Sequence, residues 1–514
     1  MKYDRIKNTR RNALWGFLEK GCGILLPFLV RTALIHRLGM AYAGVGGVFT
    51  SVLQVLSLAE LGLGSAVVYS LYRPLAEDDT GKICALLRFY RNMYRALGTA
   101  VLVLGVVLFP FLPRITGADL PPDVALGGVY GAYLLHAAAG YFVFPERKAL
   151  LQSAQRTDAI SRAALLMRLF SFAGQMAALL LSRNYHAYIL FLPLSALGDQ
   201  LLCAFAAKRL YPSYICRGSL DASSRRDILE KTKGLFVHRL LGQTRNAADQ
   251  LFVSAFFGLT AVGMYGNYFY ILQSVRSLLD VITFSMSAGV GNSAVSESAE
   301  KNYRDLNTFT FLYEALCAVC AACLLCLYQP FMLLWCGESA LFSLDTVIAF
   351  CVYFYVWTMG DIKSQYADAR GLWWKNRFRT ACEALANIAL NALLARWLGV
   401  FGIVIATAIS ILLVGFPWST MILFRDFFPG RSPWRYMADQ ALYALLAASG
   451  CALSFVLCGL IPTGGIGGLL LRLPVCALCP ALLWVVCFFG TSRFREAVSF
   501  LRRALSRQVR EGRR

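Results

Sequence analysis

The stretch TFTFLYEALCAVCAACLLCLYQPFMLLW, residues 308–335, decides the fold of this chain. It is apolar along almost its whole length, and Glu314 is its one acidic or basic residue. A helix of about 20 apolar residues is long enough to cross the hydrocarbon core of a bilayer. Because so long an apolar segment is unsuited to a surface in water, it predicts a membrane-spanning helix.

The same pattern recurs along the whole chain of 514 residues. Hydrophobic residues make up 58% and charged residues 15%, whereas a soluble domain carries about 25% charged residues. Apolar runs between polar breaks predict about fourteen transmembrane helices. They lie near residues 13–36, 44–70, 96–113, 124–144, 163–182, 187–207, 234–257, 264–290, 308–335, 343–362, 380–397, 401–424, 437–460 and 470–490. This composition excludes a soluble multi-domain enzyme and a receptor with a single membrane anchor.

The basic residues indicate how the chain is oriented in the membrane. There are 50 Lys and Arg against 29 Asp and Glu, which gives a net charge of +21. Cytoplasmic connections hold the excess of basic residues, and most of the 50 fall in alternate connections, beginning with the N-terminus. We therefore expect both termini in the cytoplasm and no nucleic-acid partner. The basic tail after residue 490 has interleaved apolar residues and predicts an amphipathic segment on the anionic inner leaflet.

An internal repeat relates the two halves of the chain. Residues match in order along the first helices of each half: Ser57 with Ser277, Glu60 with Asp280, Pro110-Phe111 with Pro330-Phe331, Gly117 with Gly337, Gly39 with Gly258, and Gly44 with Gly263. Both halves start on the same side of the membrane, as in parallel-repeat transporters. A cavity between two such lobes can open alternately to either side.

The expected architecture is an all-α polytopic membrane protein with two pseudo-symmetric six-helix bundles and two C-terminal helices. The predicted bounds are 1–210 for the first bundle, 211–233 for a basic cytoplasmic linker, 234–425 for the second bundle, 426–490 for the two additional helices and 491–514 for a basic cytoplasmic tail. The expected outer connections are short, which argues against an enzyme such as a polymerase or ligase with a large outer catalytic loop.

Several sequence motifs resemble those of a known family. They are Asn12 to Arg31, Leu38-Gly39 with Tyr42 and Gly44, LSLAELG at 56–62, and YSLYRPLAEDD at 69–79. This part of the chain is similar to bacterial polysaccharide-biosynthesis flippases of the multidrug, oligosaccharidyl-lipid and polysaccharide exporter superfamily. The resemblance covers about 1–425 and is strongest in the first hundred residues.

The resemblance implies a function in the bacterial inner membrane. Members of this family move polyprenyl-diphosphate-linked oligosaccharides (O-antigen or other repeat units) from the cytoplasmic to the outer leaflet, without an enzymatic step. It also implies contact with membrane lipids, a coupling ion (H+ or Na+) and polysaccharide assembly proteins as partners. Two alternatives stay open: a cation-coupled multidrug exporter of the same superfamily, and a lipid II-type peptidoglycan precursor flippase, which the fourteen-helix count also resembles.

Charged residues inside the predicted spans are the candidates for function. Each costs about 2.5–3.5 kcal/mol near the bilayer centre if it faces lipid, so we expect them to face a cavity or a partner. Arginine binds phosphate oxygens bidentately, and the candidates for substrate binding are Arg31, Arg239, Arg245 and Arg276. The candidates for gating or ion pairing are Glu19, Lys20, Glu60, Asp249 and Asp280. The spacing of Arg245 with Asp249, and of Arg276 with Asp280, allows either a bracing ion pair or a cavity-lining role.

Most of the sixteen cysteines lie in apolar runs, where cysteine acts as a small hydrophobe. Cys317, Cys320, Cys323 and Cys326 have the spacing of an iron–sulfur run. Residues three apart drift by about 60° per step around a helix, so these four sulfurs cannot surround one cluster. Cys476 and Cys479 lie in another apolar span. We therefore predict no metal site and no cofactor.

Overall fold

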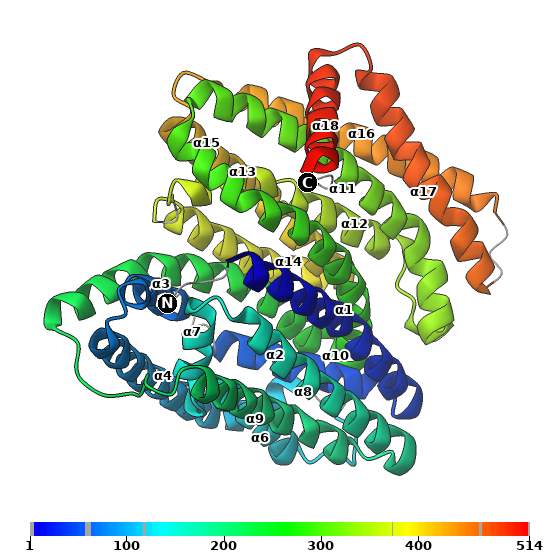
Figure 1. Cartoon of the computed structure of the whole chain (residues 1–514). Helices are drawn as coiled ribbons and strands as arrows, with labels where there is room; N and C mark the ends of the chain where they lie inside the picture. The colour runs from blue at the N-terminus through cyan, green and yellow to red at the C-terminus, as the bar shows by residue number, and fades with distance from the viewer. Residues whose placement is uncertain (1–4, 57–62, 117–119, 373, 462–464, 512–514) are drawn as a thin grey trace. The chain divides into compact units, whose positions relative to one another are not determined.

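The computed structural model describes residues 5–56, 63–116, 120–372, 374–461 and 465–511. Within these ranges the chain is helical and has no strand (Figure 1). The all-α fold that the composition predicts is therefore confirmed. The contacts between Cα atoms divide the chain into two compact units, Met1–Gly266 and Asn267–Arg514.

The described residues of unit 1 form nine α-helices that lie wholly within it, and they include the first part of α10. The nine are α1 (Arg5–Arg37), α2 (Met40–Leu56), α3 (Leu63–Ala76), α4 (Thr80–Leu108), α5 (Leu112–Thr116), α6 (Leu126–Phe142), α7 (Pro145–Ser153), α8 (Thr157–Ala177) and α9 (Tyr185–Leu210). Helix α8 packs against α1 and α9, and α9 packs against α6. A core of buried apolar side chains joins α3, α4 and α7 and includes Leu71, Leu87 and Leu150.

Helix α10 (Ala222–Ser296) runs across the boundary between the units, and the other helices of unit 2 follow it. They are α11 (Ala299–Cys336), α12 (Leu344–Thr358), α13 (Asp361–Ala369), α14 (Arg377–Ser410), α15 (Phe416–Phe427), α16 (Pro433–Gly459), α17 (Gly465–Phe488) and α18 (Ser492–Glu511). Helix α11 contains the whole stretch 308–335 and packs against α16, α17 and α12. It is therefore the central helix of this unit.

Glycines with positive φ interrupt the chain at equivalent places in the two repeats. Gly39 has φ 114° just before α2, and Gly258 has φ 79° at a break inside α10. Only glycine enters this region without a steric penalty. The repeat matched these two residues in the sequence, and both begin a new helical segment. A third such break, at Gly399 with φ 64° inside α14, lies between the predicted spans 380–397 and 401–424.

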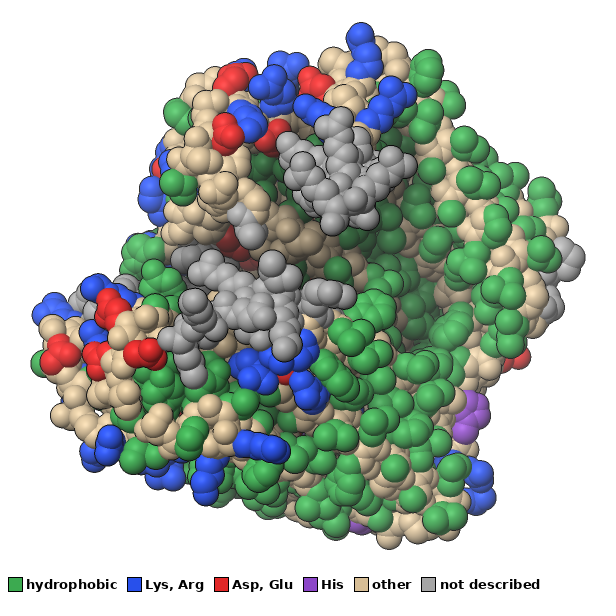
Figure 2. All heavy atoms as spheres, viewed as in Figure 1, with side chains coloured by type: hydrophobic (Ala, Val, Ile, Leu, Met, Phe, Trp, Pro, Cys, Tyr) green, Lys and Arg blue, Asp and Glu red, His purple; other side chains and the backbone are tan. Residues whose placement is uncertain are grey.

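Among the described residues, eight helices are long and apolar enough to cross a membrane. Large apolar side chains such as Leu470, Leu471 and Val486 of α17 are exposed, and Figure 2 shows hydrophobic side chains along this flank of unit 2. Because such a surface is stable in lipid and not in water, the chain is a multi-pass membrane protein. The count of fourteen spans and the cytoplasmic location of the termini stay predictions.

The start of α10 and the whole of α18 lie close to the predicted domain bounds. Helix α10 begins at Ala222, inside the expected linker 211–233, and the boundary between the two units lies later, after Gly266. The basic tail forms α18, where Arg493 donates hydrogen bonds to Asp439 Oδ2 over 2.6 Å and to the Tyr443 hydroxyl over 3.1 Å. The tail is therefore anchored on α16. The domain bounds themselves stay a prediction.

Candidate functional site

Arg276 of α10 lies at the centre of a buried polar cluster in unit 2. Its Nη2 is 2.8 Å from Asp361 Oδ1 at the start of α13 and 3.9 Å from Asp280 Oδ1 one turn further along α10. The guanidinium lies over the Trp357 ring, 4.2 Å from its centroid. Tyr313 of α11 donates a hydrogen bond of 2.7 Å to Asp361 Oδ2. The predicted pair of Arg276 and Asp280 is thus present, but Asp361 is the nearer partner.

The charges of this cluster do not balance. One guanidinium faces two carboxylates, so the group carries a net negative charge when all three are ionised. Arg276 Nη1 is buried and makes no hydrogen bond within the described part of the chain. An unpaired buried donor is costly. The guanidinium of Arg276 therefore has one unpaired N–H donor. The carboxylates of Asp361 and Asp280 compete for the same guanidinium.

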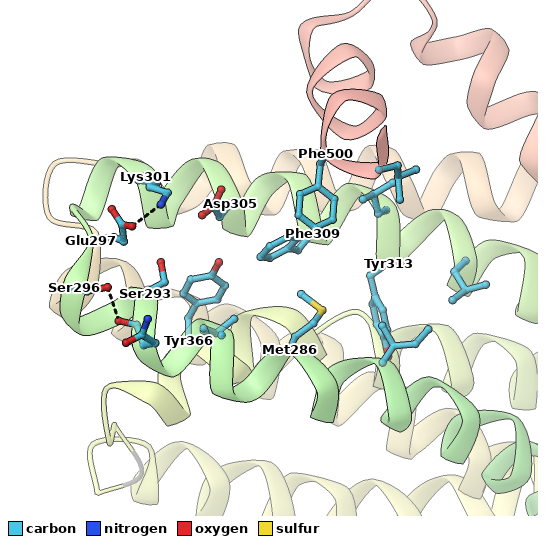
Figure 3. A pocket seen from close by; sticks show the side chains of 17 residues that line it. Met286, Ser293, Ser296, Glu297, Lys301, Asp305, Phe309, Tyr313, Tyr366 and Phe500 are labelled. Carbon is cyan, nitrogen blue, oxygen red and sulfur yellow. Dashed lines mark hydrogen bonds and ion pairs between the residues drawn. The ribbon is translucent and has the colours of Figure 1, made fainter. Parts of the chain in front are cut away.

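A pocket of about 660 Å³ lies beside this cluster (Figure 3). Its walls come from the C-terminal part of α10, from α11 and α13, and from α18. Ser293, Glu297 and Lys301 lie at one end, where Lys301 Nζ is 2.6 Å from Glu297 Oε1. Phe309 and Phe500 lie toward the other end, with ring centroids 5.1 Å apart in an edge-to-face arrangement. The pocket is polar at one end and apolar at the other.

Tyr313 connects the pocket to the arginine cluster. Its side chain lines the pocket, and its hydroxyl donates to the carboxylate that holds Arg276. A ligand that displaces Tyr313 would therefore change the partners of Asp361. The pocket wall and the ion pair form one connected arrangement on α10, α11 and α13.

In unit 1, Arg31 of α1 donates a hydrogen bond of 3.2 Å to the Gly263 carbonyl. Glu19 pairs with Arg168 of α8 over 2.7 Å, whereas the neighbouring Lys20 is exposed. These contacts join α1 to α10 and to α8. The structure thus gives Arg31 and Glu19 contacts that hold helices together.

The remaining predicted residues are only partly described. Asp249 is buried in α10 and accepts a hydrogen bond of 3.4 Å from the Tyr265 hydroxyl. The side chains of Arg239 and Arg245 lie outside the described residues, and so does Glu60. The proposed contact between Arg245 and Asp249 therefore stays a prediction.

Sequence reasoning missed Lys363, a buried lysine of α13. Its Nζ donates three hydrogen bonds of 2.8 Å each, to the Phe416 carbonyl, Ser419 Oγ and Thr420 Oγ1. Burial lowers the pKa of Lys363 well below its usual value, because a low dielectric disfavours the ammonium. The sequence held no sign of this site, since the three acceptors lie on another helix.

It also missed the cluster around Asp158 at the start of α8. This buried carboxylate lies 2.8 Å from Arg11, 3.0 Å from Arg156 and 2.6 Å from Arg162. Because three guanidinium groups surround one carboxylate, this cluster carries a net positive charge. The basic residues that flank Asp158 in the sequence, Arg156 and Arg162, were the available signal, but the pattern of basic residues predicts only the membrane orientation.

Comparisons with known proteins identify the fold. No protein-family model matches the chain, and no curated protein matches its sequence. Solved structures that are similar in fold include the following three. The lipid II flippase MurJ, in an inward-closed conformation, has a TM-score of 0.65 and 14% identity, over 93% of this chain and 98% of that one.

The other two structures are superfamily transporters. An inward-facing multidrug resistance MATE family transporter of the MOP superfamily has a TM-score of 0.59 and 14% identity, over 78% of this chain and 94% of that one. A MOP superfamily transporter from Pyrococcus furiosus Vc1 has a TM-score of 0.57 and 15% identity, over 81% and 95%. The chain therefore has the fold shared by the flippase MurJ and the MATE transporters of the MOP superfamily.

Proposed function

We propose that the chain is a flippase that moves a polyprenyl-diphosphate-linked oligosaccharide across the bacterial cytoplasmic membrane for surface polysaccharide biosynthesis. The motifs of the first hundred residues support the polysaccharide family, and the fold supports a transporter that needs no enzymatic step. The parallel repeat supports alternating access between two six-helix bundles. Both termini would lie in the cytoplasm.

The pocket in unit 2 is the observation that carries this proposal. A lipid-linked sugar has an apolar tail and a polar, anionic head, and a site for it needs walls of both kinds. The pocket places Phe309 and Phe500 toward one end, and at the other it places Ser293 and Lys301 together with the carboxylates of Glu297 and Asp305. A hydrophobic drug would use only the first group of residues.

Arg276 is the proposed ligand for the diphosphate. A phosphate oxygen that approaches the unpaired Nη1 would compete with Asp361 and Asp280 for the guanidinium. Release of Asp361 would in turn free the Tyr313 hydroxyl at the pocket wall. Substrate binding would thereby change contacts among three helices, as a transport cycle requires.

The other predicted residues complete the proposal. Arg31, Arg239 and Arg245 would contact the head group at other stages of the cycle. Glu19, Lys20, Glu60, Asp249 and Asp280 would act in gating or ion pairing, with H+ or Na+ as coupling ion and polysaccharide assembly proteins as partners. Of these, Asp249 is a buried carboxylate that accepts a hydrogen bond from the Tyr265 hydroxyl.

The test is rescue of a bacterial strain that lacks its oligosaccharide repeat-unit flippase. We expect the chain to restore surface polysaccharide and to remove the accumulated lipid-linked repeat unit. Arg276→Ala should abolish rescue while the protein still inserts, and the exposed Arg425→Ala is the matched control. Failure of the wild-type chain to rescue any of a panel of such strains would refute the proposal.

A lipid II-type precursor flippase is the second candidate. The likeness to MurJ extends over 93% of this chain, compared with 78% for the MATE transporter. Rescue of a strain depleted of its lipid II flippase would favour this function. Protection of cells against cationic drugs, without either rescue, would favour a cation-coupled multidrug exporter.

A further inference from the structure

Three buried cysteines from three helices meet at one point in unit 2. They are Cys326 of α11, Cys458 of α16 and Cys476 of α17, and their Sγ atoms all lie within 4.8 Å of one another. The Sγ atoms of Cys458 and Cys476 are 3.6 Å apart. Residues far apart in the sequence are brought together because α16 and α17 both pack against α11.

These distances fit metal coordination by thiolates. A Zn–S bond of about 2.3 Å places the sulfurs of a tetrahedral site about 3.8 Å apart and those of a trigonal site about 4.0 Å apart. The observed separations, 3.6 Å for one pair and at most 4.8 Å for the others, bracket both values. Small movements of side chains on three helices would close the site.

A fourth thiol lies beside the three. Cys323 precedes Cys326 by about one helical turn, packs against the cluster and contacts the Cys476 thiol. The pair has the C-x2-C spacing that is common in zinc sites. The remaining neighbours, Leu327 and Val475, are apolar, so the sulfurs are the metal ligands that this cluster offers.

A buried basic residue lies close to the cluster along α17. Arg472 lies one turn before Cys476 on α17 and is buried, although the chain's apolar pattern places it at a membrane edge. Its Nη2 donates to the Ile461 carbonyl over 3.2 Å, and its Nε has no hydrogen-bond partner within the described residues. The Cys458 thiol lies 3.9 Å from the Arg472 carbonyl. The backbone of Arg472 therefore lies beside the cluster, whereas its guanidinium is bonded to the chain just after α16.

We infer that Cys326, Cys458 and Cys476, with Cys323 as a fourth ligand, bind one soft d10 cation such as Zn2+ or Cu+. Thiolate ligands select such ions over Mg2+, Ca2+ and Na+. With Zn2+ the reaction is Zn2+ + 3 RSH → [Zn(SR)3]− + 3 H+, or 4 RSH → [Zn(SR)4]2− + 4 H+ when Cys323 takes part. No electron transfer is needed. The bound ion would tie α16 and α17 to α11.

The sequence could not show this site. Cys323 and Cys326 belong to a run of four cysteines whose members cannot face one point, and Cys476 lies in a separate span. Packing instead selects two members of that run and adds one cysteine from each of two later helices.

Titration of the full-length, reduced, metal-free protein in detergent with Cd2+ is the direct test. Cd2+ bound by thiolates absorbs in the ultraviolet through sulfur-to-metal charge transfer. We expect saturation at one Cd2+ per chain, displacement by Zn2+, and release of about three or four protons per ion. Proton release, measured by calorimetry in two buffers, reports the number of thiols without any variant.

Variants then locate the site. Cys458→Ser and Cys476→Ser should each weaken binding by more than about tenfold, whereas Cys479→Ser, on the same helix as Cys476, should bind as the wild type does. The alanine variants Cys458→Ala and Cys476→Ala repeat the test if the serine variants fold poorly. The inference is wrong if the wild type binds no Cd2+, or if both cluster variants bind it unchanged. A Cys458–Cys476 disulfide in the isolated protein would also overturn it, because the two ligands would be consumed.

Discussion

Gly44 and Gly263 occupy equivalent positions in a reciprocal contact between α2 and α10. A Cβ atom added to Gly44 would collide with the Leu259 carbonyl, and one added to Gly263 would collide with the Met40 carbonyl. Each glycine lies four residues after the residue that its counterpart touches. The two helices therefore cross through a local two-fold relationship, as expected where two copies of one repeat meet.

This contact predicts that Gly44→Ala and Gly263→Ala have similar effects. An added methyl group must push two backbones apart, which costs about 1–3 kcal/mol, although alanine is otherwise the better helix former. We expect both variants to lower the midpoint of thermal unfolding in detergent. Gly16→Ala is the control, because no atom lies within 4 Å of the added methyl group. An unchanged midpoint in either variant would contradict the close contact.

Arg276→Met should destabilise the protein as well as stop transport. It leaves Asp361 and Asp280 close together without their cation, and breaking a buried pair in this way costs about 3–5 kcal/mol. The double variant Arg276→Met with Asp361→Asn should recover most of the stability but not the transport. The comparison is made by thermal unfolding and by rescue of the flippase-deficient strain. Recovery of transport in the double variant would show that Arg276 only braces the helices.

Tyr313→Phe tests the link between pocket and ion pair. The change removes the hydrogen bond to Asp361 Oδ2 and leaves the ring at the pocket wall, at a cost of about 1–3 kcal/mol for the unpaired carboxylate oxygen. We expect substrate still to bind but transport to slow, because substrate binding in the pocket no longer changes the hydrogen bonding of Asp361. If this variant and the wild type transport equally fast, the hydrogen bond of Tyr313 does not couple the pocket to the arginine cluster.

Leu312→Trp tests whether the pocket is used. A larger side chain at this lining position fills part of the 660 Å³, so rescue should fall while the protein remains folded. Leu333→Trp, at an exposed apolar position of the same helix, is the matched control. Overpacking is checked by thermal unfolding of both variants, since transport lost together with the fold would say nothing about the pocket.

Patterns within one helix were predictable, and contacts between helices were not. The apolar stretch 308–335 predicted a helix, and it lies within α11. The matched glycines Gly39 and Gly258 both lie where a helix is interrupted. The i,i+4 spacing also placed Asp280 beside Arg276. Asp361 is the closer partner of Arg276. It lies at the end of the predicted span 343–362, but its approach to Arg276 depends on a contact between two helices that are far apart in the sequence. Local periodicity carries no information about such packing.

The contact of Phe500 with Phe309 makes α18 part of the pocket wall rather than a free tail. Shortening the chain before residue 500 would open the pocket to solvent, even though every membrane helix remained. Truncations that remove Phe500 therefore alter the pocket. A tag placed at the N-terminus avoids this change and is the sound choice for every measurement proposed above.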